Sequence, residues 1–132
     1  MIDTTIYNYF KNRYPKIYEE AINIINQPCL KDITLIPKIY KTLWDESKVP
    51  KEERHYFFAV LINLYHPQWF TTGCKLKIGL RDVFAEAAGY ANPEMVNDHT
   101  RRLDAYMKGK IFPKRVREET DRFLRTYCTN NK

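Results

Sequence analysis

The chain has few of the residues that build disulfide frameworks, flexible linkers or hydroxyl nucleophiles. It contains three cysteines, four glycines and one serine among 132 residues. The cysteines, Cys29, Cys74 and Cys128, are odd in number and widely spaced, which predicts reduced thiols. No repeat, low-complexity tract or separating linker occurs. We therefore expect a single domain over residues 1–132, with an aromatic-rich part at 1–50 and a basic part at 51–132.

Long apolar runs are also missing. The most apolar run, residues 56–65, contains Asn63 and is too short to span a bilayer. The first fifteen residues are polar and lack the apolar stretch of a secretory signal. The sequence therefore predicts a soluble, cytoplasmic protein without a membrane partner.

Residues suited to catalysis or metal binding are few and unsuitably spaced. Ser47 has no histidine at a spacing that would activate it. His55 and His66 lie about three turns apart on one expected helix, too far to share a metal ion. Neighbouring glutamates, as at 52–53, diverge by about 100° on a helix and cannot converge on one substrate. We expect no enzyme, no cofactor, no metal and no small-molecule substrate.

Most of the chain shows helical spacing of apolar residues. Expected helices outside residues 80–108 are 3–13, 16–28, 34–46, 51–66 and 113–127. The helix at 51–66 is apolar nearly all round, which places it at the centre of the core. Residues 67–79 are expected to form a loop, with Trp69 and Phe70 folded over the core. Only 75–78 and 111–112 suit brief extended structure, so the predicted class is all-α, with about six helices.

Positive charge is concentrated in the second half of the chain. Residues 1–74 carry nine Lys/Arg against eight Asp/Glu, whereas residues 75–132 carry thirteen against eight. A basic half indicates a polyanionic partner, of which nucleic acid is the most common. The alternative interpretation is a solvated basic surface with no such partner.

The segment 80–103 combines a short helix, a glycine turn and a second capped helix. Gly89 permits the positive φ that ends a helix, and Asn92 followed by Pro93 is a typical helix start. Small Ala85, Gly89 four residues later and apolar Val96 make the segment resemble helix-turn-helix DNA-binding proteins. The interval from Gly89 to Val96 is one residue longer than in the tightest form of that pattern, which leaves Met95 as the alternative anchor.

The resemblance implies that residues 93–108 form the recognition helix. A rotation of 100° per residue turns Val96, Leu103 and Met107 inward and favours Val96 as the anchor. It leaves Asn97 and Arg101 outward, where the two can reach base edges. The residues expected to contact phosphates are Arg102, Lys108, Lys110, Lys114, Arg115 and Arg117, with Lys75, Lys77 and Arg81 beside the first helix. Glu94 and Asp98 on the same outward flank oppose DNA binding.

A second, weaker resemblance concerns the triplet Asp98-His99-Thr100. It is similar to the triplet that begins the recognition helix in the DNA-binding domain of bacterial replication initiators. Here the triplet lies nine residues after Gly89, inside the expected helix, and the register turns His99 and Thr100 toward the core. We therefore predict that His99 is a buried or half-buried histidine.

The leading hypothesis is a non-enzymatic protein that binds double-stranded DNA. The resemblance implies a regulator of transcription or an accessory factor of a phage or mobile element. A homodimer is expected, with the aromatic first fifty residues as its interface. The alternative is a helical protein-interaction module, such as a phage adaptor or a host-directed inhibitor, that does not bind nucleic acid.

Overall fold

The computed structural model of the protein describes residues 4–48, 50–72, 76 and 79–129. Within these ranges the regular elements are helical and no strand occurs, so the all-α class is confirmed. The elements are α1 (Thr4–Arg13), α2 (Pro15–Ile25), the 3₁₀ helix η1 (Ile33–Leu35), α3 (Ile36–Glu46), α4 (Pro50–Tyr65), α5 (Trp69–Thr72), α6 (Leu80–Ala88), α7 (Glu94–Met107) and α8 (Ile111–Thr129).

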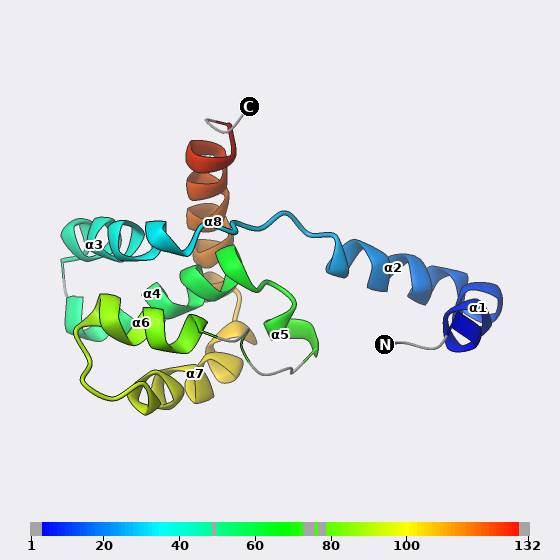
Figure 1. Ribbon diagram of the computed structural model, residues 1–132, viewed down its shortest axis with the longest axis horizontal. Helices are drawn as coiled ribbons and strands as arrows, with labels where there is room; N and C mark the ends of the chain where they lie inside the picture. Colours follow the sequence, from blue (N-terminus) through cyan, green and yellow to red (C-terminus); the bar gives the residue numbers. More distant parts are fainter. Residues whose placement is uncertain (1–3, 49, 73–75, 77–78, 130–132) are drawn as a thin grey trace.

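Helix α4 lies at the centre of the core. Every residue from Tyr56 to Ile62 is buried, as expected for a helix that is apolar on all sides. It contacts α3, α7 and α8, and Figure 1 shows these helices arranged around it. The ring of Phe58 lies 5.2 Å from that of His99 in α7 and 6.3 Å from that of Phe84 in α6. The predicted central position of this helix is confirmed.

Helix α8 is attached to α4 by a polar link as well as by apolar packing. Asn63 donates a hydrogen bond from Nδ2 to Oγ1 of Thr120, at 3.1 Å. The Thr120 hydroxyl donates in turn to the carbonyl of Val116, at 2.7 Å. This partly buried contact pairs the Asn63 amide with the Thr120 hydroxyl and so favours one register of α8 against α4.

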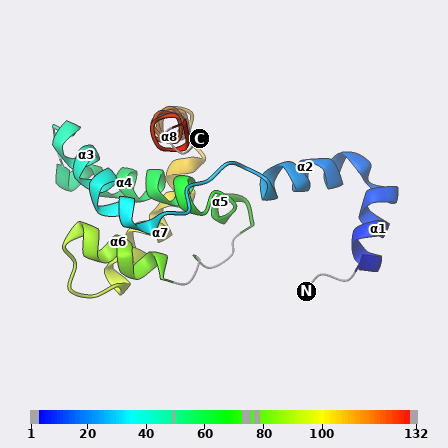
Figure 2. The ribbon, with the colours of Figure 1, turned by 45° about the horizontal axis from the view of Figure 1, so that its top comes forward.

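Helices α1 and α2 extend away from the other helices as an arm, which both views show (Figures 1 and 2). None of the residues of α1 is buried. The chain rejoins the body at Leu30, whose amide donates to the carbonyl of Leu64 at 2.7 Å. Between arm and body, one weak hydrogen bond is recorded for the described residues, from Gln68 Nε2 to the carbonyl of Ile24 at 3.4 Å. We call residues 4–25 the arm.

Several predicted boundaries need correction. The segment expected as a loop contains the one-turn helix α5, in which Trp69 and Phe70 pack against the core as predicted. The segment 111–112, considered for extended structure, begins α8 instead, because Pro113 fits the first turn of a helix. Helix α2 ends at Ile25, three residues before the expected end. The possible extended segment at 75–78 lies largely outside the described residues.

In the described ranges, no helix combines the length and the apolar character needed to cross a membrane. In the same ranges Cys29 and Cys128 carry free thiols. Cys74 lies outside the described residues.

Because α7 packs on the core by one face, we expect Leu103→Ala and Arg101→Ala to destabilise the protein by different amounts. Leu103 is fully buried, whereas the Arg101 side chain is 77% exposed. Leu103→Ala should lower the free energy of unfolding by about 2–5 kcal/mol because it leaves a cavity, and Arg101→Ala by less than about 0.5 kcal/mol. Urea unfolding followed by circular dichroism measures both, and equal losses would show that α7 is packed by a different face.

Candidate nucleic-acid interface

The candidate interface begins with the sharp end of α6. Gly89 adopts φ 77°, in the left-handed region that favours glycine. Its amide donates to the carbonyl of Glu86 at 3.1 Å, and the amide of Tyr90 donates to the carbonyl of Ala85 at 2.8 Å. This pair of bonds is a Schellman motif, which satisfies the last carbonyls of a helix and reverses the chain. The predicted glycine turn is confirmed.

Helix α7 starts with the predicted cap. The side-chain oxygen Oδ1 of Asn92 accepts a hydrogen bond from the amide of Glu94 at 3.0 Å. The amide of Val96 donates to the carbonyl of Pro93 at 3.1 Å, which continues the first turn. Asn92 therefore satisfies one of the free amides at the start of the helix, and Pro93 lies where its missing amide costs nothing.

The inner face of α7 follows the predicted register. Val96 and Leu103 are fully buried and Thr100 is 7% exposed, whereas Met95 is 44% exposed. Val96 is therefore the residue that anchors α7, as predicted. Ala85 of α6 is also buried. Both the small residue and the apolar residue of the helix-turn-helix pattern therefore face the core. These local features are shared by other helical hairpins, and the helix-turn-helix assignment remains a prediction.

The outer face of α7 is polar and accessible. Arg101 and Arg102 are exposed, and the nearest described acidic atom to the Arg101 guanidinium is Oδ1 of Asp98, at 3.7 Å. An exposed pair of this kind contributes about 0–1 kcal/mol, so it does not prevent Arg101 from binding another group. Asn97 is half-buried, and its carbonyl accepts a hydrogen bond from the Thr100 hydroxyl at 3.0 Å. The Arg101 side chain is thus more accessible to a ligand than the half-buried Asn97.

The remaining predicted phosphate contacts fall in two places. Around the turn from α7 to α8, the exposed basic residues are Lys108, Lys110, Lys114, Arg115 and Arg117. Arg81 is exposed in the first turn of α6. Lys75 and Lys77 lie outside the described residues. The turn between α7 and α8 thus extends the polar flank of α7 with positive charge.

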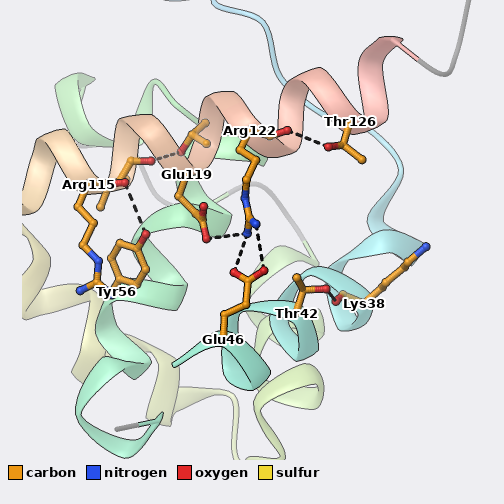
Figure 3. Close-up of polar contacts among 10 residues, drawn as sticks. Lys38, Thr42, Glu46, Tyr56, Arg115, Glu119, Arg122 and Thr126 are labelled. Carbon is orange, nitrogen blue, oxygen red and sulfur yellow. Dashed lines mark hydrogen bonds and ion pairs between the residues drawn. The ribbon is translucent and has the colours of Figure 1, made fainter. Parts of the chain in front are cut away.

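Arg115 has an internal role that sequence analysis did not predict. Its guanidinium lies 2.9 Å from a carboxylate oxygen of Glu53 and 3.9 Å from the centre of the Tyr56 ring. Figure 3 shows Arg115 beside Tyr56, and Arg122 between Glu46 of α3 and Glu119 of α8. Both arginines join helices of the core. Arg115 is therefore a less accessible phosphate ligand than Arg117.

Acidic groups interrupt the positive surface of α7. Glu94 and Asp98 are both exposed on the flank that carries Arg101. A carboxylate repels phosphates, although it can accept a hydrogen bond from the amino group of cytosine. The flank therefore offers mixed charge, and any DNA contact through it must tolerate these two groups.

His99 lies between the turn and the core. Its Nε2 is 2.7 Å from the hydroxyl of Tyr90, and the two rings are stacked. Burial lowers the pKa of His99, and the positive charges of Arg54 and Arg102 act in the same direction, whereas Asp98 opposes them. His99 is thus half-buried, as predicted from its register, and its lowered pKa disfavours the protonated form.

His55 lies on α4 next to the end of α7. Its ring stacks on that of Tyr106, with centroids 4.6 Å apart, and the ring of Phe112 lies at 5.9 Å. Burial lowers the pKa of this histidine too; Arg102 and Arg115 add to the effect and Glu53 opposes it. Within the described residues, no group of three His, Cys, Asp or Glu side chains is arranged to hold a metal ion.

The lowered pKa values of His55 and His99 predict that the free energy of unfolding depends on pH. Because each pKa is lower in the folded than in the unfolded chain, the unfolded chain binds more protons as the pH falls through the ordinary histidine range. The free energy of unfolding should therefore decrease from about pH 7.5 to pH 5.5. Replacing both His55 and His99 by Gln should flatten this dependence. Urea titrations at each pH test it, and an unchanged slope in the double variant would contradict it.

Comparison with known proteins assigns the chain to no family. No protein-family model, curated protein or solved structure matches it. The candidate interface is defined by its own geometry: a capped helix whose inner face is buried, whose outer face is exposed and whose C-terminal turn is basic.

Proposed function

We propose that the protein binds double-stranded DNA through α7 and acts without catalysis, as a regulator or accessory factor of a phage or mobile element. The observation that carries the proposal is the exposed polar flank of α7, which bears Arg101 and Arg102, continuing into the lysine-rich turn before α8. A protruding helix with this flank fits the major groove, and the basic turn fits the phosphates beside it.

Arg101 is the proposed base-reading residue. A guanidinium can donate two hydrogen bonds to the major-groove edge of guanine, and a correct pair contributes about 1–3 kcal/mol of discrimination. Lys110, Lys114 and Arg117 are proposed to contact phosphates, which position the helix without reading sequence. The opposing charges of Glu94 and Asp98 then restrict binding to sites where the flank meets base edges rather than the backbone.

Binding to short duplexes of different sequence tests this division of roles. Affinity should exist at about 50 mM salt and fall steeply by about 200 mM, because bound cations release counterions from the DNA. Arg101→Ala should reduce discrimination between sequences, whereas Arg117→Ala should weaken binding to every duplex alike and lower the salt slope by about one. Fluorescence anisotropy measures the affinity, the discrimination between sequences and the salt dependence.

The control for this experiment is Asp98→Asn, which removes a repelling charge beside Arg101. It should strengthen binding at low salt. Absence of binding to any duplex at the lowest salt would exclude the proposal. Equal effects of Arg101→Ala and Arg117→Ala would exclude α7 as the reading helix.

The arm supports the further proposal that the protein forms a homodimer. Five of its large apolar side chains, Ile6, Tyr9, Phe10, Tyr14 and Ile17, are 42–59% exposed. The rings of Tyr9, Phe10 and Tyr14 contact one another at the corner between α1 and α2, with centroids 5.7–6.3 Å apart. Two short helices with so little buried surface are poorly stabilised by themselves, so this apolar face requires a partner.

The charges of the arm favour a second copy as that partner. Lys11, Arg13 and Lys16 lie near the corner, and Glu19 and Glu20 lie further along α2. An antiparallel pair of arms places the basic corner of one copy near the acidic residues of the other. The arm therefore carries charges of both signs, unlike the basic second half of the chain, and suits self-association better than a phosphate backbone.

Sedimentation over a wide range of protein concentration tests the dimer. Wild-type protein should be dimeric at high concentration, and Tyr9→Glu should shift it to monomer because a charge then lies in the interface. The matched control is Ile111→Glu, since Ile111 is 84% exposed at the start of α8. A wild-type protein that remains monomeric throughout, or a Tyr9→Glu variant that still dimerises, would contradict the arm interface.

The alternative function is that of a protein-interaction module, whose partner is another protein rather than DNA. The acidic pair Glu94 and Asp98 on α7 favours it, because a mixed-charge helix suits a protein surface as well as DNA. In that case dimerisation through the arm persists and the duplex titrations show no binding. The two experiments above therefore separate the two functions.

A further inference from the structure

A groove of about 540 Å³ lies between α3, the beginning of α4 and the C-terminal end of α6. Its apolar lining includes Pro37 and Trp44 of α3 and Ala87 of α6. Its polar lining includes Tyr40 and Arg54. We call it the Arg54 groove, and none of the proposed DNA contacts or arm residues lines it.

Two hydrogen-bond donors in the lining have no acceptor. Tyr40 is only 4% exposed, yet its hydroxyl has no hydrogen-bond partner in the described part of the chain. The buried Nε of Arg54 is likewise without a partner. Leaving a buried donor unpaired costs about as much as a lost hydrogen bond, so each such group calls for an explanation. Burial raises the pKa of Tyr40 to about 12, which keeps its hydroxyl protonated and able to donate.

The charge of Arg54 is also uncompensated. Its guanidinium lies between two aromatic rings, 5.2 Å from the centre of Trp44 and 5.0 Å from that of Tyr90. No acidic side chain of the described residues is recorded within ion-pair distance of it, whereas Arg115 and Arg122 both have glutamate partners. A half-buried cation held by two rings and lacking a counter-charge is suited to an anionic ligand.

We propose that the Arg54 groove binds a small aromatic carboxylic acid. The carboxylate accepts hydrogen bonds from the Arg54 guanidinium and from the Tyr40 hydroxyl, which is buried in the unliganded chain and becomes reachable from the groove when the Arg54 side chain shifts. The aromatic ring lies against Trp44 and Pro37. A carboxylate fits because it offers several acceptor positions to converging donors, and an aromatic ring fits because the remaining wall is apolar. The exposed Glu86 also lines the groove and weakens binding by repulsion.

Nuclear magnetic resonance of the labelled full-length protein tests the site directly. The probes are phenylacetate and indole-3-acetate, with phenylacetamide as the neutral analogue. Both acids should shift the Nε–H signal of Arg54 and the indole signal of Trp44 in a saturable way, and the amide should bind much more weakly. Since the groove is separate from α7, this result is independent of whether the protein binds DNA.

Four variants separate a ligand site from a structural role. Tyr40→Phe should weaken binding of the acids about tenfold while leaving the melting temperature no lower, because the hydroxyl it removes has no partner. Arg54→Gln should remove detectable binding, and Glu86→Gln should strengthen it. Arg117→Gln makes the same change of net charge as Arg54→Gln outside the groove and should leave the affinity unchanged.

Three results would overturn the proposal. The first is the absence of shifts with either acid, and the second is equal binding of acid and amide, which would indicate an apolar groove without an anion site. The third is undiminished binding in folded Tyr40→Phe and Arg54→Gln variants. The Tyr40→Phe variant keeps the test decisive even if Arg54→Gln fails to fold.

Discussion

The arrangement of the helices follows from the burial of α4, whose residues 56–62 are buried on every side. A helix whose side chains are apolar all round must be covered by other helices, and α3, α7 and α8 provide that cover. Fully burying one large apolar side chain contributes about 1.5–3 kcal/mol, and several of the buried residues, such as Phe57 and Phe58, are of that size. Helix α7 is mostly polar, so its orientation is determined by the few residues, above all Val96 and Leu103, that face this core.

The same constraint divides the arginines into groups with different roles. Arg115 and Arg122 are held by glutamates and join helices of the core. Arg101 is directed outward, because the opposite side of α7 is occupied by the core. Arg54 is held by two aromatic rings without a counter-charge. Net charge alone therefore overstates the positive surface available to a polyanion, since part of it is neutralised internally.

Local rules predicted most of the elements. Helical spacing of apolar residues predicted the central helix and the inner face of α7. Gly89 and Asn92 predicted the turn, because the hydrogen bonds at a helix end involve residues that are close in the sequence. Helix α5 was missed because Trp69 and Phe70 pack against residues distant in the sequence, which helix propensity does not report. The errors at α2 and α8, in contrast, concern where a helix ends or begins rather than whether it exists.

The functional surfaces were less predictable. The exposure of Arg101 followed from helical periodicity. The ion pair between Arg115 and Glu53 did not, because it depends on contact between α4 and α8, which are distant in the sequence. The Arg54 groove gave no sequence signal either, because it is assembled from three helices and depends on unpaired atoms rather than on a motif. The exposed arm was expected as an aromatic region, but its projection from the body required the structure (Figure 1).

Packing against α4 leaves the outer flank of α7 exposed, and we propose this flank as the DNA-binding surface. The most direct measurement is a map of backbone and arginine side-chain chemical shifts of the labelled protein upon addition of a mixed-sequence duplex at low salt. The largest changes should occur at the exposed residues of α7 and at the turn before α8, with the core of α4 unchanged. Changes confined to the arm, or no changes at all, would contradict it.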